Sequence, residues 1–306
     1  MESKNYSTVT EFILLGLSSD TSNQVLFFII ILVVYATSLA ANILLILAVI
    51  FDHRLHNPMY FFLINLSLVN LGGPTVTIPK MLANFFSGKK SISFTGCASQ
   101  IFFYLLLGGS ECLLLVFMAY DRFVAICDPL HYTTVMSKSA CAWMITVTWT
   151  ANCVMSSIDI FFLCTLIFCG PNVINHFFCE IPSLMHLACS DTSINDVLRL
   201  GGSAILLLVP PILILLSYVK IIISIIRIQS GRYKVFSTCF SHLTVVVLFY
   251  ATVTFMYVRP RSSEADNTDK IMSVFCTIIT PLLNPLIYSL RNKDVLRAMR
   301  HLGRRK

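Results

Sequence analysis

The chain has 306 residues, of which 56% are hydrophobic and only 12% are charged. A typical soluble domain carries about 25% charged residues, so this composition excludes an ordinary water-soluble fold. The net charge of +7 comes largely from the tail after Leu290, where basic side chains recur among apolar ones at helical spacing. That pattern predicts an amphipathic helix on anionic membrane lipid and not a nucleic-acid-binding tail.

Seven apolar segments recur along the chain, each long enough to cross about 30 Å of hydrocarbon as a helix. Lipid offers no hydrogen bonds to the backbone, and no segment alternates like a barrel strand, so each is predicted to be helical. We expect an all-α membrane protein: an N-terminal segment 1–24, a seven-transmembrane helix bundle 25–290, and a tail 291–306 with an amphipathic helix. The expected spans are 25–51, 59–86, 99–126, 141–163, 197–226, 237–258 and 271–290.

Basic residues predict the orientation, because they concentrate in cytoplasmic connections. With the N-terminus outside, 14 lysines and arginines lie on the cytoplasmic side and 8 on the other, which favours an extracellular N-terminus. Asn5 begins an Asn-Tyr-Ser glycosylation motif on the outer side, although so short a motif often arises by chance. Cys97, Cys169, Cys179 and Cys189 also fall on this oxidising side, where four cysteines permit three disulfide pairings.

Four motifs stand at matching ends of the predicted spans. Residues 55–63 read LHNPMYFFL, 118–132 read MAYDRFVAICDPLHY, 234–243 read KVFSTCFSHL and 281–292 read PLLNPLIYSLRN. Together they resemble vertebrate odorant receptors of the tetrapod type (class II), within the rhodopsin-like G-protein-coupled receptors. The resemblance covers nearly the whole chain and implies disulfides joining Cys97 to Cys179 and Cys169 to Cys189.

The function that this resemblance implies is the detection of odorants. Such a receptor binds small volatile molecules, activates the stimulatory olfactory-type G protein and raises cAMP. It is a multi-pass protein of the plasma membrane, in the cilia of olfactory neurons. The resemblance implies no enzymatic activity and no cofactor, and the sequence has no phosphate loop or nucleophile motif.

The motifs also imply switch residues at the cytoplasmic end. By resemblance, Arg122 is held near Asp121 at rest and is released towards the G protein on activation. A snorkelling arginine at the membrane edge is the alternative. Asn284 and Pro285 would bend the seventh helix, because proline removes a backbone hydrogen bond. The resemblance adds three coupling residues, namely Tyr218, Lys234 and Tyr288.

Glu111 lies at mid-membrane, where an ionisable residue indicates a functional site. By resemblance, this glutamate and an aspartate of the second helix hold a sodium ion, but Asn70 stands at the matching position. One carboxylate is therefore missing. We expect either a weakened sodium site at Asn70 and Glu111 or a protonated Glu111 that hydrogen-bonds Asn70.

Ligand sites in helical bundles lie between helices and are mostly apolar. Counting outward from Arg122 places Tyr104, Leu105, Gly108 and Gly109 on the inner face of the third helix, where the glycines leave room for a ligand or for close helix packing. Tyr104 stands where amine receptors carry aspartate, so we expect a neutral cavity for a mainly apolar ligand. The resemblance adds further wall residues, namely Gly202, Ser203, Leu206, Tyr250, Val253, Tyr257, Val274 and Thr277.

Asp159 is an unusual acid near the outer end of the fourth span. It lies ten residues before Cys169, where the family usually has histidine. Its carboxylate is either a solvated helix-end charge or a ligand-binding group that selects polar or basic odorants.

The rival interpretation is a small-solute transporter or channel. Many transporters are built from paired repeats with interrupted helices and carry charges at the membrane midplane. Here we find no internal repeat, and only Glu111 lies deep in a span. The sequence therefore favours the receptor.

Overall fold

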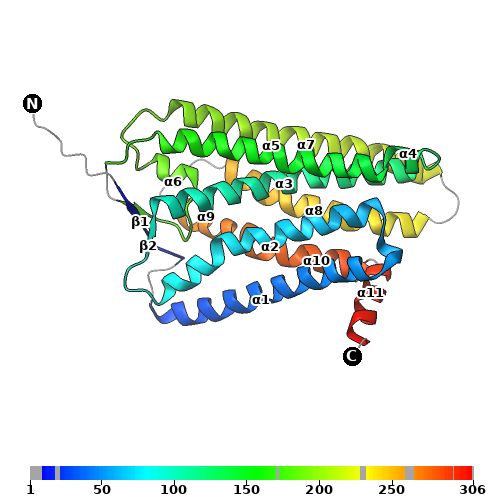
Figure 1. Ribbon diagram of the computed structural model, residues 1–306, viewed down its shortest axis with the longest axis horizontal. Coiled ribbons are helices and arrows are strands. Elements are labelled where there is room, and N and C mark those ends of the chain that lie inside the picture. Colours follow the sequence, from blue (N-terminus) through cyan, green and yellow to red (C-terminus); the bar gives the residue numbers. More distant parts are fainter. Residues whose placement is uncertain are drawn as a thin grey trace, which may run out of the picture.

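Long helices run side by side along the molecule in the computed structural model, which describes residues 9–17, 21–169, 172–227, 232–258, 265–291 and 293–304 (Figure 1). The first six long helices are α1 (Thr21–Phe51), α2 (Pro58–Phe85), α3 (Phe94–Cys127), α5 (Lys138–Cys164), α7 (Ser193–Arg227) and α8 (Arg232–Val258). The seventh crossing consists of α9 (Ala265–Val274), the π-helical turn η2 (Phe275–Ile279) and α10 (Thr280–Arg291).

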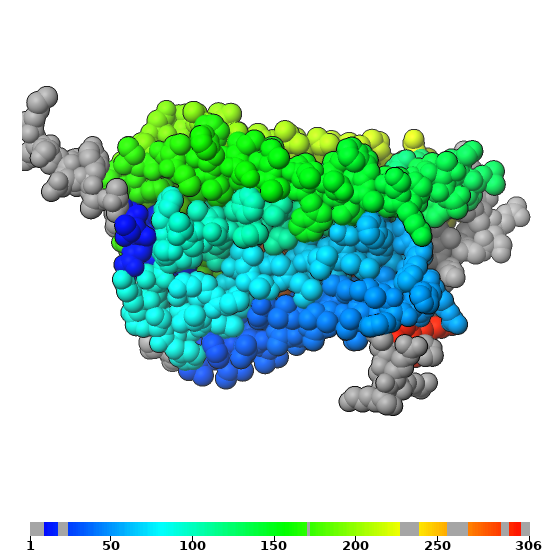
Figure 2. Space-filling model, viewed as in Figure 1, coloured from blue at the N-terminus to red at the C-terminus, as the bar shows by residue number. Residues whose placement is uncertain are grey.

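The described residues contain 6 helices that are long and apolar enough to span a membrane, and a shorter apolar helix, Cys239–Phe255, within α8. Exposed apolar side chains such as Ile29, Val154 and Leu215 cover the outer faces of α1, α5 and α7. Figure 2 shows α1 in blue along the lower edge of one face of the bundle, α2 in light blue to cyan above it, and α5 in green near the upper edge. The predicted seven-helix membrane bundle is confirmed.

Three of the long helices begin at a capping side chain. Asn57, Ser93 and Ser137 are the N-caps of α2, α3 and α5, and each side-chain oxygen accepts a hydrogen bond from a backbone N–H of the first turn. Such caps satisfy donors that have no partner within the helix. Pro58 follows Asn57 at the start of α2, where its missing N–H costs nothing.

The seventh crossing is interrupted before Asn284 and Pro285, the position at which the sequence predicted a bend. Its turn η2 is π-helical, and the N–H of Thr280 donates to the carbonyl of Phe275. Pro281 follows directly and cannot donate a backbone hydrogen bond, so the α-helical pattern is interrupted at this point. Hydropathy alone could not reveal this change of register.

A small sheet closes one end of the bundle, called here the sheet end. The strands β1 (Glu11–Leu14), β2 (Ser91–Ser93) and β3 (Val173–Ile174) lie in the order β2-β1-β3. β1 is antiparallel to β2 and parallel to β3. The sequence predicted no strand in the N-terminal segment 1–24.

Packing and charge hold β1 in place. Phe12 is fully buried, and its ring centroid lies 5.5 Å from that of Phe168 and 6.2 Å from that of Phe94. The Lys89 ammonium lies 2.6 Å from an oxygen of Glu11 and lowers the pKa of that carboxyl group. Because this ion pair is exposed, the aromatic packing contributes more to stability.

Disulfides tie the loop between α5 and α7 over the sheet end. Cys179 is joined to Cys97 at the start of α3, and Cys169 to Cys189 within the loop. A short helix, α6 (Ile181–Met185), follows Cys179. These are the two pairings that the resemblance implied.

Three short helices mark the opposite end, called here the tail end: η1 (His53–Leu55), α4 (Tyr132–Val135) and α11 (Lys293–Arg304). In Figure 1, α11 leaves the bundle at a steep angle to α10. Val295 and Ala298 on one face of α11 are buried, whereas Asp294, Arg297 and Arg300 are exposed. The predicted amphipathic C-terminal helix is therefore present.

The substitution Phe12→Ala should release β1 from the sheet. Removing a buried phenylalanine ring costs about 3–5 kcal/mol, which exceeds what the exposed ion pair can offset. Hydrogen–deuterium exchange of the purified receptor should then show faster exchange at the amides of Ile13 and Leu14, which are bonded to Asn172 and Lys90. Glu11→Gln is the control that removes the ion pair alone, and equal protection in Phe12→Ala and wild type would contradict this account.

Candidate functional site

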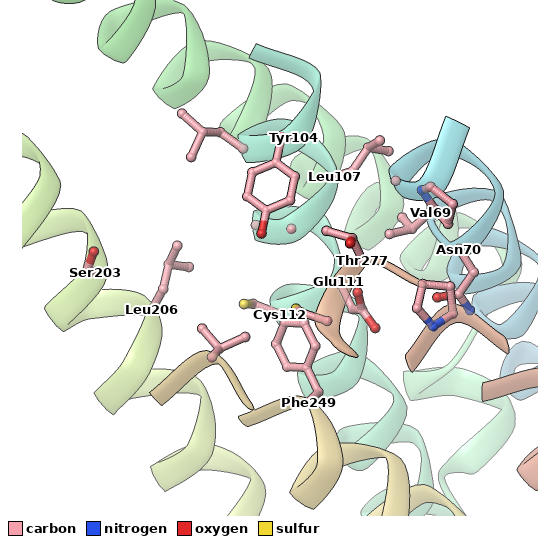
Figure 3. Close-up of a pocket in the computed structure, with 18 of the residues that line it drawn as sticks. Val69, Asn70, Tyr104, Leu107, Glu111, Cys112, Ser203, Leu206, Phe249 and Thr277 are labelled. Atoms are coloured by element: carbon pink, nitrogen blue, oxygen red, sulfur yellow. The ribbon is translucent and has the colours of Figure 1, made fainter. Parts of the chain in front are cut away.

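A cavity of about 130 Å³ lies between the helices in the half of the bundle nearer the sheet end (Figure 3). Its walls come from α2, α3, α7, α8, η2 and α10 and are mostly apolar. The residues that line it are Val69, Asn70, Gly73, Pro74, Tyr104, Leu105, Leu107, Gly108, Gly109, Glu111, Cys112, Ser203, Leu206, Leu207, Phe249, Val253, Cys276, Thr277 and Pro281. An apolar cavity of about 150 Å³ holds benzene, so this one suits a small molecule.

Most of the wall residues expected from the sequence border this cavity. Those that do are Tyr104, Leu105, Gly108, Gly109, Ser203, Leu206, Val253 and Thr277. Figure 3 shows the ring of Tyr104 and the side chains of Leu206, Phe249 and Thr277 around the same space. The inner face of α3 was therefore placed correctly by counting helical turns from Arg122.

Four of the expected wall residues are described and do not line the cavity, namely Tyr250, Val274, Gly202 and Asp159. Tyr250 is buried in the core with its ring perpendicular to that of Phe249, and Phe249, one residue earlier on α8, faces the cavity instead. Val274 packs beside Phe178, and Gly202 lies outside the lining set. The side chain of Tyr257 is outside the described residues.

Asp159 is the fourth, and the sequence left its role open between a helix-end charge and a ligand-binding group. It lies half-buried on α5, and no residue of α5 lines the cavity. This position favours the first alternative, a carboxylate near the helix end.

The two glycines of α3 differ in what surrounds them. A Cβ on Gly109 would collide with the side-chain amide of Asn152 on α5, so this glycine permits close helix packing. A Cβ on Gly108 would meet nothing within 4 Å, so this glycine leaves space beside the cavity. The sequence left both roles open for both residues, and the structure assigns one to each.

A buried polar cluster forms the base of the cavity. The side-chain N–H groups of Asn284 on α10 donate to Asn70 Oδ1 at 3.1 Å and to Glu111 Oε1 at 3.2 Å. Asn42 on α1 donates to the carbonyl of Pro281 at 3.0 Å. Asn70 and Glu111 therefore meet through Asn284 and not directly.

This cluster fits a sodium ion poorly. It contains one carboxylate, and the Asn284 amide donates to both oxygens that would have to face the cation. Among the described residues, no group of three or more histidine, cysteine, aspartate or glutamate side chains could hold a metal. The cluster instead links α2, α3 and α10 at mid-bundle.

At the tail end, Asp121 pairs with a tyrosine and not with Arg122. Its Oδ1 accepts a hydrogen bond of 2.7 Å from the Tyr132 hydroxyl of α4. The described residues include no Asp121–Arg122 ion pair, so the contact expected at rest is not formed in this arrangement. Arg122 is half-buried, and its Nη2 has no hydrogen-bond partner within the described part of the chain.

The other described switch residues lie on α7 and α10. The Tyr218 hydroxyl on α7 lies 2.8 Å from Nδ1 of His242 on α8, and it also donates to the carbonyl of Cys239. The Tyr288 hydroxyl on α10 is buried without a partner among the described residues. Pro285 lies inside α10, one residue after Asn284. The side chain of Lys234, like Asn5, is outside the described residues.

The sequence did not reveal the α2 wall or the part of α8 that faces the cavity, and it named Asn70 and Glu111 without placing them at the base of the cavity. Residues such as Val69, Phe249 and Cys276 face the cavity because of the helix rotations, which no motif encodes. A signal for the base was present, since Glu111 and Asn284 are polar residues inside apolar spans. Their meeting through one amide could not be deduced from one chain.

Seven membrane helices, a mostly apolar cavity near one end, and an arginine with buried tyrosines at the other define a rhodopsin-like G-protein-coupled receptor. A model of the olfactory receptor family matches residues 31–306. Olfactory receptor 5AR1 of Mus musculus is 49% identical over 304 residues, covering 99% of this chain and 98% of that protein. Olfactory receptor 13C9 of Homo sapiens is 48% identical over 314 residues, covering 100% and 99%.

Olfactory receptor 10A7 of Homo sapiens is also similar, at 45% identity over 299 residues that cover 97% of this chain and 95% of that protein. The chain belongs to the olfactory receptor family. It is an odorant-sensing, G-protein-coupled receptor of the plasma membrane and not an enzyme. Membership of this family sets the transporter interpretation aside.

The contrast between the two glycines can be measured. Alanine has a helix propensity about 1 kcal/mol better than glycine, so Gly108→Ala should be neutral or slightly stabilising. Gly109→Ala should destabilise the receptor by about 1–3 kcal/mol, because the new methyl group must displace the buried Asn152 side chain, which donates to the Thr148 carbonyl. The midpoint of thermal unfolding of purified receptor distinguishes the two, and equal midpoints would show that Asn152 gives way freely.

Proposed function

We propose that the cavity binds small, mostly apolar volatile molecules and that their binding activates a stimulatory, olfactory-type G protein, which raises cAMP. The single observation that carries the ligand class is the cavity itself. It offers about 130 Å³, apolar walls and the hydroxyl groups of Tyr104, Ser203 and Thr277 as polar contacts. No charged anchor for an amine lies at Tyr104, which favours neutral ligands.

The orientation in the membrane is part of the proposal. The N-terminus and the sheet end face the cell exterior, and α11 lies on the anionic lipid of the inner leaflet. Disulfides persist in oxidising compartments, and both described disulfides lie at the sheet end. Basic residues at the tail end are consistent with the cytoplasmic side. The cell type is the olfactory neuron, with the receptor in its cilia.

Two elements connect the cavity to the tail end. Helix α3 carries Tyr104 at the cavity and Arg122 at the tail end without a break. The seventh crossing lines the cavity with Cys276 and Thr277 and continues into Asn284 and Tyr288. A ligand that favours one arrangement of these helices therefore shifts the population at the tail end.

The unpaired polar groups support two arrangements of the tail end. Arg122 Nη2 and the Tyr288 hydroxyl are buried without hydrogen-bond partners in the described part of the chain. A buried unsatisfied group costs about 1–3 kcal/mol, so an arrangement that pairs these groups gains stability. We propose that the active state is this arrangement and that the G protein stabilises it in turn.

The ligand proposal is tested by reducing the cavity from one wall. Cells that report cAMP and express the wild-type receptor should respond to members of a panel of neutral volatile compounds. Leu206→Phe should weaken responses to the larger agonists more than to the smaller ones, because the added ring atoms occupy the cavity. Leu215→Phe, on the exposed face of the same helix, and Asp159→Asn should leave the order of agonists unchanged. A Leu206→Phe receptor with the wild-type order would place the ligand elsewhere.

The coupling proposal is tested at Arg122. The charge reversal Arg122→Glu should abolish the agonist-dependent rise in cAMP while cell-surface expression, measured with an N-terminal epitope tag, stays close to wild type. Cells that lack stimulatory G-protein α subunits should likewise lose the response of the wild-type receptor. Preserved cAMP production in either case would contradict the proposed role.

A further inference from the structure

Gln100 joins three segments of the chain near the side of the cavity that faces the sheet end, called here the roof. It lies on α3, one turn after Cys97, and only 4% of its surface is exposed. Its Oε1 accepts a hydrogen bond of 2.8 Å from the backbone N–H of Cys179 in the loop between α5 and α7. Its Nε2 donates to the carbonyl of Val76 on α2 at 3.0 Å. One buried amide therefore ties that loop to two helices.

The bond to Cys179 fixes what the disulfide leaves free. The Cys97–Cys179 disulfide holds the sulfur atom of Cys179, but rotation about the side-chain bonds could still turn the backbone. The hydrogen bond from the Cys179 N–H orients the peptide plane, which also contains the Cα of Phe178. The position of Phe178 thus depends on Gln100.

Phe178 in turn packs on a cavity residue. It is fully buried, and its ring centroid lies 5.1 Å from that of Tyr104, which lines the cavity. Phe177 is also buried, and the two phenylalanines share an apolar cluster with Ile31 and Met81. On the opposite side of the loop, Lys270 of α9 donates to Asn175 at 2.7 Å. The loop is therefore anchored from both α3 and α9, with Phe178 between.

We propose that Gln100 is a positioning residue for ligand selection, which holds Phe178 against Tyr104 and thereby sets the height of the cavity roof. The inference rests on the proposed ligand site. Gln100 lies outside the cavity and contacts no ligand, yet it influences which agonist length the receptor prefers.

Gln100→Met tests this role, because methionine has a similar length and shape and makes neither hydrogen bond. The probes are straight-chain aliphatic alcohols from butanol to decanol, and the measured quantity is the ratio of EC50 values for the longest and the shortest active alcohol. Loss of a hydrogen bond of ordinary strength predicts a change of about threefold to tenfold in this ratio. A general loss of folding would lower the number of receptors at the surface without moving the ratio.

A matched control removes a different hydrogen bond from the same loop. Asn172 donates to the carbonyl of Glu11 in β1, on the side of the loop that faces the sheet. Asn172→Leu should leave the EC50 ratio at its wild-type value. An equal change of the ratio in Asn172→Leu and Gln100→Met would overturn the specific role of Gln100.

The route through Phe178 has its own test. If Gln100 acts by holding Phe178, then Phe178→Leu should change the ratio by itself, and adding Gln100→Met to it should produce little further change. Independent, multiplying effects would overturn the route. Gln100→Glu retains an acceptor for the Cys179 N–H and is expected to keep the wild-type ratio, which covers the case in which Gln100→Met fails to reach the surface.

Failure of the ligand proposal is distinguishable from failure of this inference. If no alcohol activates the wild-type receptor, the ligand class tested is wrong, and hydrogen–deuterium exchange of the purified receptor decides the role of Gln100. Gln100→Met should then speed exchange at the Phe178 amide as well as at Cys179, whereas Asn172→Leu should not. Unchanged exchange at Phe178 would show that the loop is held without Gln100.

Discussion

Hydrocarbon offers no hydrogen bonds, and this constraint shapes every part of the protein. Each peptide group that crosses the membrane must be paired within its own helix, and each polar side chain within the bundle must face another. The Asn284 amide obeys this rule by donating to both Asn70 and Glu111, and the π-helical turn at Phe275–Ile279 obeys it with a bond from Thr280 to Phe275. Among the described residues several buried side-chain atoms lack a partner, and Arg122 Nη2 and the Tyr288 hydroxyl are the ones at the tail end that bear on function.

Helix α3 connects the two ends of the bundle, and it contacts α2, α5 and α7. At the sheet end it carries Cys97 and Gln100, which hold the loop. At mid-bundle it contributes Tyr104 to the cavity and Glu111 to the polar base, and at the tail end it carries Asp121. A change in ligand, loop or G protein therefore acts on one rigid element, which explains how sites at opposite ends can influence each other.

The sequence was sufficient for the fold and for the family, because hydropathy and ordered motifs do not depend on fine geometry. It also placed Tyr104 and Gly108 at the cavity, since counting turns along one helix is reliable. The sequence did not predict the features that depend on how neighbouring helices pack. The rotation of α8 turns Phe249 and not Tyr250 towards the cavity, and Asp159 on α5 lies outside it. The approach of α5 separates the role of Gly109 from that of Gly108. Tyr132, which donates a hydrogen bond to Asp121, comes from a short helix that no hydropathy pattern reveals.

The strand β1 carries a consequence for the order of assembly. Ile13 pairs with Ser91 on one side and with Val173 on the other, so residues made first are completed by residues made much later. Contacts between such distant positions form slowly, because a long loop must close before they are made. During synthesis Phe12 can meet Phe94 early, but its second aromatic partner, Phe168, is made only when the loop after α5 emerges. Until the sheet has formed, the uncovered apolar side chains of β1 are a binding site for a chaperone of the secretory pathway. A receptor whose sheet never forms would keep this site exposed.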